Sequence, residues 1–157
     1  MLYVILFAVI LSDQFSKLFF SQVLILGEPL VVVKGFFYLT LVHNRGGAFG
    51  ILKGWLPLFF LISLFTIGIV WKALEKEKAR MFSAYSCALS LIVAGGIGNL
   101  IDRVRFGYVV DFLDFRVWPV FNIADSAITI GAILLGWQVL KAPKTGGALK
   151  CGSKEGF

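Results

Sequence analysis

Four apolar stretches dominate this chain, and each is long enough to cross a lipid bilayer. A membrane-spanning helix needs roughly 20 mostly apolar residues, and the stretches cover residues 2–20, 55–74, 81–101 and 120–140. Hydrophobic residues fill 59% of the 157 positions and charged residues only 15%. A soluble fold of this size cannot bury so much apolar surface. The sequence therefore predicts one all-α membrane domain with four transmembrane helices.

The basic residues predict the orientation of these helices. Short cytoplasmic loops of membrane proteins are enriched in Lys and Arg. Four basic residues lie at the end of the second stretch and in the link to the third, and four more follow the last stretch: Lys72, Lys76, Lys78, Arg80, Lys141, Lys144, Lys150 and Lys154. We therefore expect both termini to be cytoplasmic, with residues 21–54 and 102–119 facing outward. The tail 142–157 is rich in Gly and Lys, and we expect it to be disordered.

The first outward segment has the composition of short strands. Residues 23–51 are rich in Val, Phe, Tyr and Thr and are interrupted by the turn residues Gly27, Pro29 and Gly35, a pattern typical of strands. We predict a small extracytoplasmic β-sheet between helices 1 and 2, lying against the membrane surface. Residues 108–114 are a second β-prone stretch. The net charge of +6 does not indicate nucleic-acid binding, because the basic residues form no single stripe.

The aspartates are distributed unevenly. All five lie in a predicted span or in an outward segment: Asp13, Asp102, Asp111, Asp114 and Asp125. A rise of about 1.5 Å per residue puts Asp13 in the outer half of the first span. An acid at the centre of a spanning helix costs about 2.5–3.5 kcal/mol. We expect the acids to converge at one membrane depth, near the outer face.

Two sets of polar residues that include these aspartates can be interpreted as purely structural or as functional. Asp13 and Lys17 are four residues apart, so they share a helix face and can form an ion pair. Asn99, Asp102 and Arg103 lie at the outer end of the third span, where Asp102 and Arg103 can simply anchor the helix end. The sequence leaves both interpretations open.

Asp111 and Asp125 are candidates for a catalytic pair. Asn122 and Asp125 have the spacing of a helix cap, so capping alone could explain Asp125. Asp111 lies only 14 residues earlier. Two carboxylates brought to one place can share a proton, one acting as acid and the other as base.

The sequence gives little support for a metal site or for a catalytic triad of Ser or Cys with His. His43 is the single histidine and has no Ser or Cys partner that spacing identifies. Cys87 and Cys151 match no metal-binding spacing. We therefore expect neither a metal nor an organic cofactor.

Five motifs resemble those of lipoprotein signal peptidase, or signal peptidase II, a family of membrane aspartic proteases. They occur in the family's order and cover most of the chain between residues 13 and 128: DQFSK at 13–17, NRGGAFG at 44–50, GGIGNLIDR at 95–103, VVDF at 109–112 and FNIAD at 121–125.

The resemblance implies an aspartic endopeptidase of the bacterial cytoplasmic (inner) membrane. Its catalytic residues would be Asp111 and Asp125. Its substrates would be prolipoproteins whose future N-terminal cysteine carries diacylglyceryl, cut just before that cysteine. The partners we expect are these prolipoproteins and membrane lipid, with no nucleic acid, and we expect a monomeric enzyme. The residues expected to support the pair or the substrate are Asp13, Lys17, Asn44, Gly46, Asn99, Asp102, Arg103 and Asn122.

Two other classes of protein carry polar residues within spans. An ion-coupled transporter would have its acids spread across the membrane depth, whereas here they gather on the outer side. A structural subunit would depend weakly on any single aspartate. Both remain alternatives to the protease.

Overall fold

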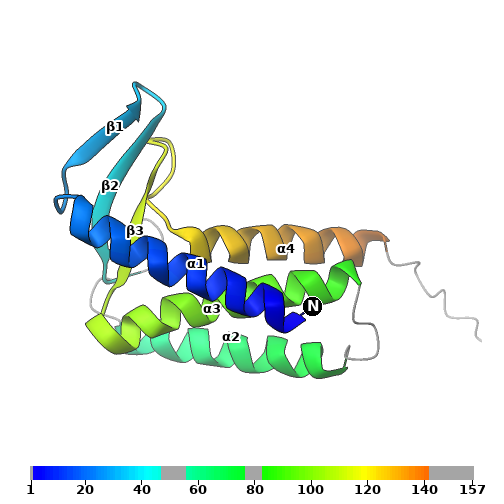
Figure 1. Cartoon of the computed structure of the whole chain (residues 1–157). Helices are drawn as coiled ribbons and strands as arrows, with labels where there is room; N and C mark the ends of the chain where they lie inside the picture. Colours follow the sequence, from blue (N-terminus) through cyan, green and yellow to red (C-terminus); the bar gives the residue numbers. More distant parts are fainter. Residues whose placement is uncertain (1, 47–55, 77–82, 142–157) are drawn as a thin grey trace, which may run out of the picture.

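The computed structural model describes residues 2–46, 56–76 and 83–141. In these ranges it contains four helices and three strands: α1 (Leu2–Val23), β1 (Pro29–Val33), β2 (Phe37–Asn44), α2 (Leu56–Lys76), α3 (Ala84–Phe106), β3 (Val109–Asp114) and α4 (Ile123–Lys141). Figure 1 shows the helices lying side by side, with the sheet at one end of the bundle and projecting on the side of α4. The predicted disorder of the tail 142–157 concerns residues outside the described ranges.

All four predicted helices are present. Three are long and apolar enough to cross a membrane, over Tyr3–Val23, Ala84–Phe106 and Ile123–Lys141. In α2 the apolar part within the described residues is the shorter segment Ser63–Ala73. A fourth membrane span therefore stays a prediction.

The third helix extends beyond the span predicted at 81–101, because its end is set by a cap rather than by hydropathy. Gly107 adopts the left-handed conformation (φ 74°), and its amide donates to the carbonyl of Arg103. Glycine takes this conformation without steric cost and commonly ends helices. The additional residues carry Asp102 and Arg103 on regular helix at the edge of the sheet.

The sheet is larger than the sequence predicted. Its strand order is β1-β2-β3, so the hairpin between α1 and α2 is joined by a third strand from the link between α3 and α4. Antiparallel pairing of β2 with β3 sets Asn44 opposite Val109 and Tyr38 opposite Asp114. The prediction placed the sheet between helices 1 and 2 alone and was incomplete, because pairing between distant segments is not encoded in local composition. The sheet thus connects the two halves of the chain.

The third helix packs against each of the other helices, and glycine permits the closest approaches. A Cβ atom built on Gly98 would lie 2.7 Å from the Asp13 carboxylate, and one on Gly95 would collide with the carbonyl oxygen of Ala124. Only glycine fits such positions. These close approaches bring α1, α3 and α4 together around Asp13.

Exposure in this bundle is reversed relative to a soluble protein. Phe15 is 72% exposed, whereas Asp13 on the same helix is fully buried. Large apolar side chains cover the outer faces of the helices, for example Phe7, Leu11 and Phe65. This is the distribution expected of helices surrounded by lipid, with ionic groups kept inside.

Candidate active site

A cavity of about 230 Å³ opens where β2, α3 and α4 meet. Segment 118–121, which connects β3 to α4, forms one wall. The polar side chains that line the cavity are Asn44, Asn99, Arg103, Asp125 and Thr129. Asp111 does not line it in the described part of the chain and is only 1% exposed.

Asn122 begins α4 and joins both candidate catalytic residues. Its side-chain oxygen accepts from the Asp125 amide at 2.9 Å, and its own amide donates to Asp125 Oδ2 at 3.3 Å. This reciprocal arrangement is the cap predicted from spacing. Asn122 Nδ2 also donates to Asp111 Oδ1 at 2.7 Å. One buried side chain therefore starts the helix and holds Asp111 beside it.

Asn99 links Asp125 to Lys17, which lies on α1. Its Nδ2 donates to Asp125 Oδ1 at 2.8 Å. Its Oδ1 accepts from Lys17 Nζ at 3.1 Å and from Asn122 Nδ2 at 3.0 Å. Both functional groups of this amide are used, so its orientation is determined by its neighbours.

Lys17 lies between two buried carboxylates. Its Nζ is 2.8 Å from Asp13 Oδ2 and 2.9 Å from Asp102 Oδ2. The pair predicted from the four-residue spacing is present, and Asp102 joins it. Asp13 also accepts from the Ala124 amide at 2.9 Å, and Asp102 from the Val110 amide at 3.0 Å. The structural interpretation of these residues is therefore supported, and the cluster contacts the site through the hydrogen bond from Lys17 to Asn99, while a functional role stays a prediction.

The remaining predicted residues surround the same cavity. Asn44 Nδ2 donates to Asp111 Oδ2 at 2.9 Å, and Asn44 Oδ1 accepts from the Gly46 amide at 3.0 Å. Arg103 donates to the carbonyl of Asn99 at 3.4 Å and places its guanidinium in the cavity lining. The structure thus brings together every residue that the sequence proposed for the site.

Burial and charge give Asp111 an unusual protonation behaviour. Desolvation and, to a smaller extent, the nearby Asp125 carboxylate raise the pKa of this carboxyl to about 7, against the hydrogen bonds from Asn44 and Asn122. Asp111 therefore holds a proton for part of the time at neutral pH. Asp125 stands in the first turn of α4, where the helix dipole favours a negative charge. Such a pair can both donate and accept a proton.

Sequence reasoning missed Gln14. Its Nε2 lies within 3.1 Å of Asp13 Oδ2 and of Asp102 Oδ1, and within 3.2 Å of the Gly98 carbonyl. The sequence did offer one indication that Gln14 belongs to the buried polar cluster: it is a polar amide in an apolar span, directly next to Asp13.

The fifth aspartate, Asp114, stays apart from the cavity. It accepts from the Thr40 hydroxyl at 2.7 Å and from the Arg116 amide at 2.9 Å. Successive side chains of a strand alternate between its two faces. Asp114 therefore points away from the face that carries Asp111.

Comparison with known proteins gives matches along almost the whole chain. The family model described as Signal peptidase (SPase) II matches residues 5–141. The lipoprotein signal peptidase of Halothermothrix orenii is 44% identical over 146 residues, which cover 93% of this chain and 99% of that protein. That of Caldanaerobacter subterraneus subsp. tengcongensis is 46% identical over 138 residues, covering 87% and 94%. A bacterial membrane enzyme solved by the in meso method has 34% identity and a TM-score of 0.79, covering 99% of this chain and 94% of its own. The segment matched by the family model contains every residue of the site.

Proposed function

The chain belongs to the signal peptidase II family, membrane proteases that remove signal peptides from lipoproteins, and we propose that it acts as an aspartic endopeptidase with Asp111 and Asp125 as the catalytic pair. One observation carries the proposal: the Asn122 side chain accepts from the Asp125 amide and donates to the Asp111 carboxyl, so a single residue holds Asp125, which lines the cavity, and Asp111, which is buried, next to each other. The raised pKa of Asp111 supports a shared proton.

The first step needs one ionised and one protonated carboxyl. Asp125, ionised at the start of α4, takes a proton from a water molecule whose oxygen attacks the scissile carbonyl carbon. Asp111 gives its proton to the carbonyl oxygen. The product of this step is a neutral tetrahedral diol, and the two carboxyls have exchanged protonation states.

The second step restores both groups. Asp125 passes its proton to the amide nitrogen, and Asp111 takes a proton back from one hydroxyl of the diol. The carbon–nitrogen bond breaks and releases the amine of the cysteine and the carboxyl of the signal peptide. The cycle closes with Asp125 ionised and Asp111 protonated, and it uses no metal or organic cofactor.

Access to Asp111 requires a local exchange of partners. Asn44 lines the cavity and occupies Asp111 Oδ2. The scissile carbonyl would replace the Asn44 amide there, and Asn44 would then be free to bind the substrate backbone. Arg103, also in the lining, supplies positive charge beside the reacting carbonyl.

The proposed substrate is a prolipoprotein whose cysteine carries diacylglyceryl. All four helices would cross a bacterial cytoplasmic membrane, with both termini inside and the sheet on the outer surface. The exposed apolar faces of the helices and the apolar sheet residues support this placement. Buried acids gather around one cavity and its neighbouring sheet in the described residues, which favours a protease over a transporter with acids along its depth.

The test is cleavage of a lipidated prolipoprotein by purified variants. Asp111→Asn and Asp125→Asn should each lose nearly all turnover, because an amide can neither accept nor release the required proton. Asparagine caps helices about as well as aspartate, so a capping role alone predicts a mild effect for Asp125→Asn.

The matched control is Asp114→Asn. It lies on the same strand as Asp111 and can keep hydrogen bonds to Thr40 and Arg116 through its amide. This variant should cleave like the wild type. Near-normal turnover by Asp111→Asn or Asp125→Asn would falsify the catalytic assignment.

A further inference from the structure

Arg116 has an unusual backbone conformation. It is the one non-glycine residue with a positive φ, 65°, in the described part of the chain. The Val117 amide donates to the Phe115 carbonyl at 2.7 Å, which closes a three-residue turn around Arg116. Such a turn with a positive φ at its centre is the rare and strained form of the γ-turn. Strained residues persist only where their surroundings hold them, and they cluster at active sites.

The turn lies in the middle of a short loop that forms a wall of the candidate active site. The loop is closed by backbone pairing: the Phe121 amide donates to the Leu113 carbonyl at 3.0 Å, and the Leu113 amide donates to the Phe121 carbonyl at 2.8 Å. Between these paired residues, residues 118–120 line the cavity. The residue that follows the loop is Asn122, which joins the two candidate catalytic residues. The loop therefore connects the turn at Arg116 to the cavity wall.

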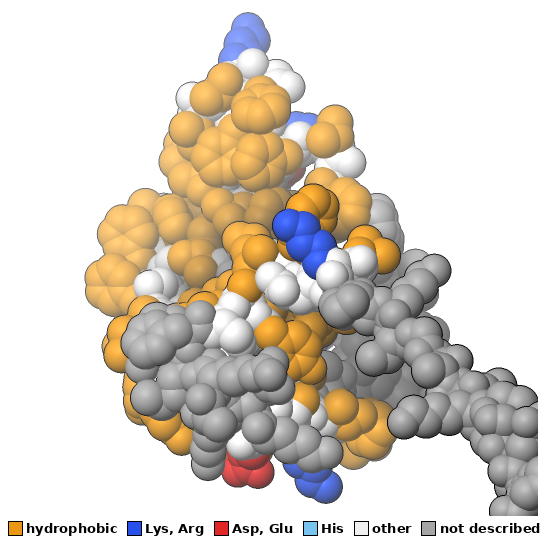
Figure 2. Space-filling view, turned by 90° about the vertical axis from the view of Figure 1, so that its right-hand side faces the viewer, with side chains coloured by type: hydrophobic (Ala, Val, Ile, Leu, Met, Phe, Trp, Pro, Cys, Tyr) orange, Lys and Arg blue, Asp and Glu red, His pale blue; other side chains and the backbone are white. Residues whose placement is uncertain are grey.

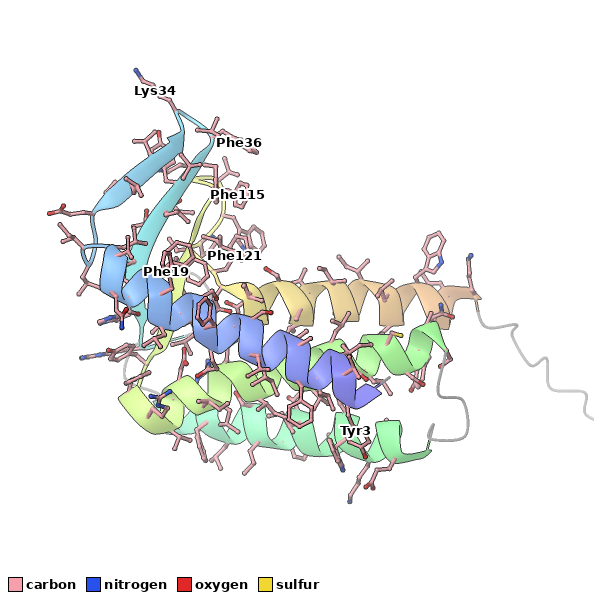
Figure 3. All side chains as sticks on the ribbon, viewed as in Figure 1. Tyr3, Phe19, Lys34, Phe36, Phe115 and Phe121 are labelled. Atoms are coloured by element: carbon pink, nitrogen blue, oxygen red, sulfur yellow. The ribbon has the colours of Figure 1, made fainter. Side chains whose placement is uncertain are left out.

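Aromatic packing holds the two ends of the loop on one face of the sheet. The ring of Phe115 lies 5.9 Å from that of Phe121 and 4.8 Å from that of Phe37, between centroids. Figure 3 shows Phe115 and Phe121 on the side of the sheet that faces along α4. Figure 2, viewed along the helices from the end opposite the sheet, shows hydrophobic side chains covering this side of the sheet. The ends of the loop are thus fixed, and the path between them depends on the turn at Arg116.

The Arg116 side chain holds the turn on the opposite face. Its guanidinium carbon lies 3.9 Å from the centre of the Tyr38 ring, a cation–π contact. Tyr38 directly opposes Asp114 in the sheet, and neighbouring residues of a strand face opposite sides, so this contact lies on the other face from Phe37. The Arg116 amide donates to Asp114 Oδ1 at 2.9 Å, a bond that the Asp114→Asn control keeps. The Arg116–Asp114 ion pair, at 3.7 Å and partly exposed, contributes little.

We propose that Arg116 is a positioning residue for signal-peptide removal. Its contact with Tyr38 holds the left-handed turn, and the turn holds the loop as the cavity wall beside Asp125, which lines the same cavity. Arg116 itself is not among the described residues that line the cavity, so it acts through the loop rather than by touching the substrate. The inference rests on the proposed function, because it takes this cavity as the place of cleavage.

Two substitutions at position 116 separate the backbone from the side chain. Arg116→Gly and Arg116→Ile both remove the guanidinium group. Glycine adopts a positive φ without steric cost, whereas a positive φ is a genuine outlier for a β-branched residue. Arg116→Gly should therefore cleave a lipidated prolipoprotein nearly like the wild type. Arg116→Ile should lower kcat/KM by roughly tenfold or more, because a small misplacement away from the chemistry can be this costly.

The matched control is Arg105→Ile. Arg105 is exposed and lies over the Phe106 ring at 5.0 Å, but it belongs to the regular helix α3 and is not among the cavity-lining residues described. This variant should cleave like the wild type. Melting temperatures are measured on the same samples, and kcat/KM is referred to folded enzyme. A lower melting temperature of Arg116→Ile with unchanged kcat/KM would reveal a purely structural turn and overturn the inference, as would equal losses by Arg116→Gly and Arg116→Ile.

A second measurement needs no isoleucine at position 116. Tyr38→Leu removes the ring that holds the turn, and glycine at position 116 needs no such contact. Tyr38→Leu should therefore lower kcat/KM in the wild-type background but not in the Arg116→Gly background. Residues that act through one contact show this lack of additivity. No loss in the wild-type background, or an equal loss in both, would contradict the proposal.

The outcomes also separate this inference from the catalytic pair. Unchanged kcat/KM in Arg116→Ile together with loss of turnover in Asp111→Asn would reject the role of Arg116 and leave the pair standing. Loss in Arg116→Ile, retention in Arg116→Gly and near-normal turnover in Asp111→Asn would reject the pair and still support the role of Arg116 in shaping the cavity.

Discussion

Replacing Lys17 tests whether the ion cluster supports the site. Lys17→Met removes the one cation that lies between Asp13 and Asp102 and leaves two buried carboxylates facing each other. Breaking a buried ion pair by removing one partner costs about 3–5 kcal/mol. Both carboxylates lose their ion-pair partner here, so we expect the upper half of that range. For a chain of this length the melting temperature falls by about 2–4 °C per kcal/mol.

Two comparison variants separate charge from packing. Asp13→Asn keeps the Lys17–Asp102 pair and should cost less than half as much as Lys17→Met. The triple variant Lys17→Met, Asp13→Asn, Asp102→Asn removes every charge of the cluster. Replacing a whole set of buried ionic groups by uncharged ones often changes the free energy of unfolding little. This variant should therefore regain most of the stability that Lys17→Met loses.

The assay is thermal unfolding of the purified protein in detergent, followed by tryptophan fluorescence, with lipoprotein cleavage measured in parallel. Cleavage should stay impaired in the triple variant, because Asn99 has lost the donor that Lys17 provides. A Lys17→Met protein within about 1 kcal/mol of the wild type would refute the reasoning. So would a triple variant no more stable than the single one.

Three further outcomes are expected. Because the mechanism needs protonated Asp111, whose pKa is raised to about 7, the proton is present below that pH and lost above it. Turnover followed across pH should therefore fall as the pH rises through about 7, and a rise there would exclude Asp111 as the acid. In a background with Cys87 and Cys151 changed to Ser, an impermeant maleimide added outside the cell should label Lys34→Cys but not Lys76→Cys, and the reverse would invert the topology. A strong chelator should leave cleavage unchanged, whereas loss of activity restored by zinc would point to a metalloenzyme.

Most of the helical part of the fold can be predicted from the sequence alone. Each helix corresponds to one apolar stretch, and the length of such a stretch depends only on neighbouring residues. The cap formed by Asn122 and Asp125 and the pair formed by Asp13 and Lys17 are also local, since each depends on positions three or four apart. These features could be predicted without knowing which helices touch.

Contacts between distant segments could not be predicted in the same way. Nothing near Val109–Asp114 indicates that it pairs with the hairpin strand Phe37–Asn44. The position of Asp102 against Lys17 depends on how closely α1 approaches α3 at Gly98. The burial of Asp111 behind Asn44 likewise depends on packing between β2 and β3.

The hydrogen bonds among Lys17, Asn99 and Asn122 run in one direction only. An ammonium group can only donate and an ionised carboxylate only accepts, so Asn99 must present its oxygen to Lys17 and its nitrogen to Asp125. The same Asn99 oxygen accepts from Asn122, whose nitrogen also donates to Asp111. Deamidation of Asn99 or Asn122 would leave the shape of the side chain intact and set an acceptor against an acceptor. A carboxylate at either buried position should therefore impair cleavage and also lower the stability of the protein, because an unpaired buried charge is costly.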